Sequence, residues 1–144
     1  EENLKVTDIK EFINNETSLK LGQDVILKTN ILEKKDLSSL LQETALGVIP
    51  SLWSEEICRV AQEFLLCGTP VCVSGVGSLN DVLFPGAGWN YQSLAEEDLL
   101  RCFADWLKKS ALESQEDRIK RGLKAKDLFS FETMSKNLKK LLNF

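Results

Sequence analysis

The stretch Ala45–Gly77, ALGVIPSLWSEEICRVAQEFLLCGTPVCVSGVG, decides the fold of this chain. Residues 45–50 form a short apolar run that ends at a proline, which is typical of a strand that cannot continue its ladder. Residues 56–67 have the spacing of a helix and are followed by glycine. Residues 70–74 form a second apolar run. The stretch therefore predicts strand, loop, helix, strand and loop, with the strands buried in a parallel sheet.

The flanking sequence repeats this alternation. We expect further strands at 24–29 and 89–91, and helices at 8–21, 36–41, 93–109, 113–126 and 131–142. Strands that alternate with helices indicate an α/β fold with a Rossmann-like parallel sheet. The length of 144 residues fits one domain over 1–144, with closing helices at about 113–143.

Composition excludes several kinds of site. The chain has no histidine, and its four cysteines (Cys58, Cys67, Cys72 and Cys102) form no C-x-x-C pair. A zinc site of Cys and His, or a nucleophile paired with His, is therefore not expected. Thiols without an evident disulfide partner are typical of a reducing compartment. No apolar run is long enough to span a bilayer. We therefore expect a cytoplasmic protein.

Charge is distributed unevenly along the chain. Residues 118–144 carry eight Lys and Arg against two Asp and Glu, which leaves ten against twenty in residues 1–117. An acidic body argues against nucleic acid as a partner. The basic helices at the C-terminal end allow weak contact with an anionic membrane at its cytoplasmic face, although a solvated helical face is the simpler interpretation.

Two glutamates flank the start of the central helix. Glu55 lies at its mouth, and Glu63 lies about 12 Å farther along if the whole span is helical. A helix N-terminus presents unpaired N–H groups that favour phosphate, and each carboxylate accepts hydrogen bonds from a diol. By spacing alone, two such glutamates on a surface helix are most simply solvated side chains.

The same residues resemble the donor-binding segment of the retaining group 1 glycosyltransferases, which have the GT-B fold. Pro50-Ser51, the pair Glu55 and Glu63 with seven residues between them, and Gly68-Thr-Pro-Val are similar to the family's P-S, E-x7-E and G-x-P-V pattern. Residues 76–81, VGSLND, resemble the V-G-G-L-P-E segment that follows. The resemblance covers about residues 20–143.

The resemblance implies a role for each matched position. Glu55, the candidate catalytic residue, would bind hydroxyls of the donor sugar, and Glu63 would bind the ribose. Backbone groups of the segment Ile57, Cys58, Arg59 and Val60 would bind the diphosphate, and the turn containing Thr29 and Asn30 would face the base. The family generally needs no divalent metal, so the resemblance implies a nucleotide-sugar substrate without a metal or other cofactor.

The resemblance also implies partners. These residues contain neither the family's first strand–helix pair, nor its Arg and Lys that neutralise the leaving diphosphate, nor an N-terminal acceptor-binding domain. The chain is thus expected to be a C-terminal part that is inactive alone. In the family's strand order, strands 24–29 and 45–49 lie on opposite sides of absent ones. The unpaired edge should pair with a second chain or a second copy.

Two alternatives remain open. One is a dinucleotide site at Gly75-x-Gly77, although Asn80 stands at the third glycine position and the acids about twenty residues on, Glu96 and Glu97, begin a helix. The other is a non-catalytic nucleotide-sugar-binding or assembly subunit. It is favoured by Cys58, which stands where the family has a glycine that lets the backbone approach phosphate.

Overall fold

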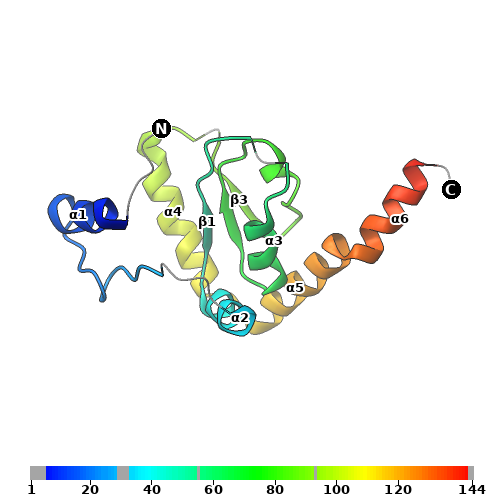
Figure 1. Cartoon of the computed structure of the whole chain (residues 1–144), viewed down its shortest axis with the longest axis horizontal. Coiled ribbons are helices and arrows are strands. Elements are labelled where there is room, and N and C mark those ends of the chain that lie inside the picture. Colours follow the sequence, from blue (N-terminus) through cyan, green and yellow to red (C-terminus); the bar gives the residue numbers. More distant parts are fainter. Residues whose placement is uncertain (1–5, 29–32, 55, 93, 143–144) are drawn as a thin grey trace. The chain divides into compact units, whose positions relative to one another are not determined.

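The computed structural model describes residues 6–28, 33–54, 56–92 and 94–142 (Figure 1). They form two compact units, Glu1–Lys34 and Lys35–Phe144, each of which is considered by itself. The single domain expected over 1–144 therefore stays a prediction.

The first unit contains helix α1 (Val6–Glu16) and a turn. The strand predicted at 24–29 is wrong for its described residues, which show only an isolated bridge between Leu21 and Val25. Asp24 instead closes the turn, because its carboxylate accepts a hydrogen bond from the backbone N–H of Lys20 at 2.8 Å. A β-branched run without a neighbouring strand gains no ladder hydrogen bonds, and Ile26 is accordingly exposed.

The second unit is an α/β layer structure. Its elements are α2 (Lys34–Glu43), β1 (Gly47–Ile49), α3 (Arg59–Leu66), β2 (Val71–Val73), the 3-10 turn η1 (Ser78–Asn80), β3 (Gly88–Asn90), α4 (Glu96–Ala111), α5 (Gln115–Phe129) and α6 (Phe131–Leu141). The strands form one parallel sheet in the order β1-β2-β3. In its register Val48 lies opposite Cys72, and Cys72 opposite Trp89. The predicted Rossmann-like fold is confirmed.

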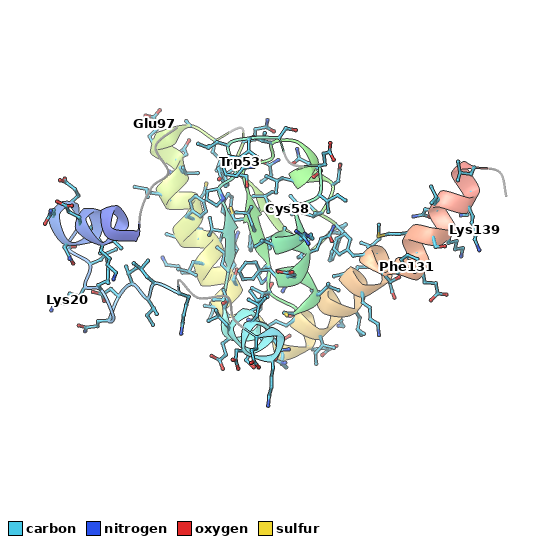
Figure 2. The ribbon with its side chains drawn as sticks, in the orientation of Figure 1. Lys20, Trp53, Cys58, Glu97, Phe131 and Lys139 are labelled. Carbon is cyan, nitrogen blue, oxygen red and sulfur yellow. The ribbon has the colours of Figure 1, made fainter. Side chains whose placement is uncertain are left out.

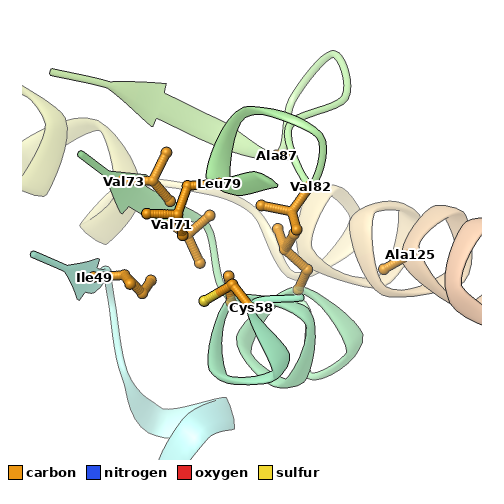
Figure 3. Packing of buried hydrophobic residues seen from close by; sticks show 10 residues of the cluster. Ile49, Cys58, Val71, Val73, Leu79, Val82, Ala87 and Ala125 are labelled. Atoms are coloured by element: carbon orange, nitrogen blue, oxygen red, sulfur yellow. The ribbon is translucent and has the colours of Figure 1, made fainter. Parts of the chain in front are cut away.

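Helices cover both faces of this sheet (Figure 1). On one face the side chains of Val71 and Val73 pack with α3, η1 and α5 in the main apolar core (Figure 3). On the other face α4 contributes aromatic rings. Trp106 stacks on Trp89 with ring centroids 5.6 Å apart, and Phe103 lies 5.5 Å from the Tyr91 ring. All three residues of β2 are buried, as expected of a central parallel strand.

Strand β1 is an edge in the described part of the chain, where it pairs with β2 alone. Its middle residue, Val48, is half exposed. The predicted pairing of this edge with another chain is not tested by these contacts. None of the described helices has the length and apolar character needed to cross a bilayer.

Candidate functional site

The candidate site lies at the carboxyl edge of the sheet, where the loops after the three strands meet. Ser74, directly after β2, donates its hydroxyl to the carbonyl of Ser51 at 2.6 Å, and this bond joins the loops after β1 and β2. Tyr91, directly after β3, makes a side-chain hydrogen bond with Ser74. Burial and the neighbouring Cys72 raise the pKa of Tyr91, against the lowering effect of Ser74. In open α/β sheets this edge is where ligands bind.

Two asparagines hold the loop after β2. Asn80 donates its side-chain amide to the carbonyl of Gly75 at 2.9 Å, and Asn90 donates to the side-chain oxygen of Asn80. Gly75 has φ +80°, and a Cβ there would lie 2.5 Å from the Asn90 amide nitrogen. Only glycine fits this turn without strain. Sequence reasoning did not identify Ser74, Asn80 or Asn90 as site residues; the available signal was their position directly after or near predicted strand ends.

The same loop argues against the dinucleotide alternative. That fingerprint requires a helix whose N-terminus receives the pyrophosphate directly after the glycine turn. Here Gly75 and Gly77 lead into the three-residue 3-10 turn η1, and Asn80 is its last residue, with its amide engaged by Gly75. We therefore do not assign a dinucleotide site to this turn.

Helix α3 begins later than the sequence predicted. The expected start at Glu56 is wrong, because the helix begins at Arg59 and Cys58 is its N-cap, with φ −88° and ψ 87°. Cys58 is only 2% exposed, and its side chain belongs to the apolar core (Figure 3). The estimated 12 Å between Glu55 and Glu63 assumed a continuous helix and does not apply.

The N-terminus of α3 has the electrostatic character of an anion site. The first N–H groups of any α-helix lack intrahelical acceptors and carry its positive dipole end. The N-cap residue of α3, Cys58, makes no side-chain cap hydrogen bond within the described residues. By contrast, the Ser114 and Ser130 hydroxyls accept hydrogen bonds from backbone N–H groups at the starts of α5 and α6.

The predicted site residues separate into three groups. Glu55, Thr29 and Asn30 lie outside the described residues. Ile57 and Cys58 precede α3, where Ile57 is 62% exposed. The side chains of Arg59, Val60 and Glu63 are exposed on the surface of α3.

The Glu63 carboxylate is near the far end of α3. Burial is the main cause that raises the pKa of the Cys67 thiol, and the negative charge of Glu63 adds to it. Glu63 is the fifth of the eight residues of α3, four residues before the C-cap Cys67.

A cavity of about 280 Å³ lies beside the entrance to α3. It is lined by Glu56, Ile57, Cys58, Gln62, Ser78, Asp81, Val82, Leu128, Phe129 and Met134. The Ser78 hydroxyl is buried and has no hydrogen-bond partner among the described residues. This volume is just below the usual range of small-molecule sites, about 300–1,000 Å³, so the cavity can hold a small ligand or part of a larger one. Its hydroxyl, amide and carboxylate groups favour a ligand rich in hydroxyl groups.

Trp53 adds an aromatic surface to the same edge. It is 68% exposed and lies in the loop after β1 (Figure 2). Trp89 and Trp106, in contrast, stack on each other between the sheet and α4.

Comparison with known proteins identifies the family. A family model described as "Glycosyl transferases group 1" matches residues 7–125, most of the chain. The chain belongs to the group 1 glycosyltransferase family. No curated protein and no solved structure matches it. Group 1 glycosyltransferases have the GT-B architecture, to which the open parallel sheet of this glycosyltransferase domain corresponds. The matched range includes the loops after all three strands.

Proposed function

We propose that this chain is the C-terminal, donor-binding domain of a retaining group 1 glycosyltransferase. It binds a nucleotide-diphosphate sugar, whose sugar is transferred to an acceptor held by another domain or chain. The observation that carries the proposal is the family match over residues 7–125. The meeting of the three loops at the carboxyl edge of the sheet supports it.

The proposed donor lies across the N-terminus of α3. The diphosphate accepts hydrogen bonds from first-turn N–H groups near Ile57, Cys58 and Arg59, where the dipole favours negative charge. Glu63 lies about 7.5 Å along the helix axis from Cys58, five residues at 1.5 Å each, and accepts hydrogen bonds from the ribose hydroxyls. Glu55 accepts from hydroxyls of the transferred sugar.

The replacement of the family's glycine by Cys58 is compatible with this arrangement. Its φ of −88° is accessible to any residue, and its side chain is buried among apolar neighbours. The Cβ therefore occupies core volume and leaves the outer side of the backbone accessible. Cys58 is the observation that favours a second candidate function, a non-catalytic nucleotide-sugar-binding or assembly subunit, and its buried position weakens that case.

The four reduced cysteines support a cytoplasmic location for this function. All four cysteines lie in the described part of the chain, and none of them forms a disulfide. Burial raises the pKa of Cys72 to about 12, which keeps that thiol protonated and unreactive. We propose that the domain acts in the cytoplasm, where thiols of this kind persist.

Calorimetric titration tests donor binding. The chain is titrated with uridine, guanosine and adenosine diphosphates and with their sugar conjugates. We expect one base to be preferred, and binding to be unchanged by EDTA. Glu63→Gln should weaken binding of the nucleoside diphosphate about 10- to 100-fold, because it removes a hydrogen bond to a charged group. Glu55→Gln should weaken binding of the sugar conjugate and leave binding of the nucleoside diphosphate unchanged. Glu97→Gln, an exposed glutamate on α4, is the matched control.

The titration also distinguishes the two candidate functions from other possibilities. If no nucleotide diphosphate binds, or if Glu63→Gln and Glu97→Gln behave alike, the donor-binding assignment is wrong. Donor binding with hydrolysis or transfer absent, even after an acceptor-binding chain is added, would favour the non-catalytic subunit. Tight binding of NADH in place of a nucleotide sugar would restore the dinucleotide alternative.

A further inference from the structure

Helix α6 exposes a continuous apolar face. Phe131 is 85% exposed, and Met134, Leu138 and Leu142 are each more than half exposed. Their spacing of three to four residues places Phe131, Met134 and Leu138 on one side of the helix, and the C-cap residue Leu142 continues this row. In a globular domain, an apolar stripe of this kind normally faces the core. A simple solvated basic helix, the interpretation favoured by its charge alone, does not account for it.

Lysines lie beside and opposite this face. Lys136, Lys139 and Lys140 are exposed. They line a shallow depression of about 570 Å³ together with Phe131, Glu132 and Ser135. Glu132 is the one acidic residue in the sequence of α6. Long lysine side chains can lie along an apolar surface and keep their ammonium groups at its polar boundary.

The position of α6 leaves Phe131, Leu138 and Leu142 accessible within the second unit, while Met134 also lines the cavity beside the entrance to α3. The helix follows α5 directly, since Ser130 is both the C-cap of α5 and the N-cap of α6, and it extends away from the sheet (Figure 1). The side chains of Phe131 and Lys139 lie on this extended part (Figure 2). At 11 residues it is about 16 Å long, too short to cross a bilayer.

We propose that α6 binds the surface of an anionic membrane. The apolar face enters the boundary between headgroups and acyl chains, and the lysines contact anionic headgroups. An apolar face opposite a lysine-rich face on a helix of low mean hydropathy is the pattern of interfacial helices. A protein partner is less well matched, because lysine is depleted at protein interfaces. A second copy of the same face would bring like charges together. This inference does not depend on donor binding.

Vesicle flotation with the full chain tests the proposal. The chain should bind vesicles of equal parts phosphatidylcholine and phosphatidylserine more tightly than vesicles of phosphatidylcholine alone, and added salt should weaken this binding. Lys139→Gln/Lys140→Gln should reduce the partition coefficient about thirtyfold. Phe131→Ser should reduce it at least about tenfold. Phe131 is so exposed that its replacement should not disturb the core.

Two matched controls lie on α4. Lys108→Gln/Lys109→Gln removes a second exposed, adjacent lysine pair, and Leu100→Ser removes a leucine that is 81% exposed. Both should leave vesicle binding unchanged. The proposal is overturned if the chain does not bind anionic vesicles, or if the α4 and α6 variants lose binding equally. A dimer in light scattering that Phe131→Ser abolishes would overturn it by assigning this face to a second copy.

Discussion

Replacing Arg121 with methionine is expected to destabilise the Lys35–Phe144 unit strongly. The Arg121 side chain is 6% exposed and pairs with both carboxylate oxygens of Glu113. It also donates to the carbonyl of Gly86 at 2.6 Å and to that of Gly68 at 2.8 Å. One guanidinium therefore joins α5 to the turn before it and to the loops that precede β2 and β3.

The magnitude follows from what the substitution leaves behind. Methionine fills much of the volume, but the carboxylate of Glu113, itself only 20% exposed, loses its countercharge. Removing one partner of a buried ion pair costs about 3–5 kcal/mol. If the unfolding free energy falls by about 2 kcal/mol per molar of urea, the urea midpoint of unfolding should fall by about 2 M. Far-UV circular dichroism during urea titration measures this change.

Two further variants separate the buried charge from other effects. Arg121→Met/Glu113→Gln should recover part of the loss, because no unpaired carboxylate remains. Arg101→Met is the matched control: Arg101 pairs with Asp98 on the surface of α4 and is 75% exposed. An exposed pair contributes at most about 1 kcal/mol. If Arg121→Met and Arg101→Met shift the midpoint equally, the reasoning about the buried pair is refuted.

Three further results are expected. Ser114→Ala removes the N-cap of α5 and should cost about 1 kcal/mol of stability. A hydrogen bond from Ser114 is the main cause that lowers the pKa of Asp117, so the stability that this bond gives at neutral pH is lost as pH falls below about 4. Urea titrations at several pH values should show a smaller loss of stability at low pH in the variant. Glu63→Gln should lower the raised pKa of Cys67 and so speed alkylation of its thiol, measured against the alkylation rate of Cys102 in the same chain. An unchanged rate would show that the Glu63 charge does not act on Cys67. Because β1 has a neighbour on one side among the described residues, light scattering should give a mass above 16.2 kDa, and a well-ordered monomer would contradict this pairing.

Much of the second unit was predictable because its signals are local. The apolar runs that became β1 and β2 are bounded by Pro50 and Gly68. The central strand β2 is buried throughout, whereas the edge strand β1 exposes its middle residue, Val48. The residues that resemble group 1 glycosyltransferases lie in one contiguous stretch, and the family match bears out that resemblance. The finer assignments of sugar, base and mechanism stay predictions.

Other features were not predictable from local signals. The run at 24–29 has the composition of a strand, but its described residues lack the neighbouring strand that would complete a ladder. The start of α3 was placed at Glu56 by its sequence pattern, whereas the helix begins at Arg59, directly after the buried N-cap residue Cys58. Both errors arise where contacts distant in sequence outweigh local preference.

The sequence by itself determined the α/β class, the strand that leads into α3 and the family, because these depend on hydrophobic spacing and on contiguous residue patterns. Tertiary structure decided which polar groups meet. Asn90 reaches the Gly75 turn through Asn80, and Ser74 joins the loop at Ser51, only because parallel strands bring their carboxyl ends to one edge. It also decided that the apolar side chains of α6 stay exposed, since exposure depends on which surfaces the rest of the unit covers.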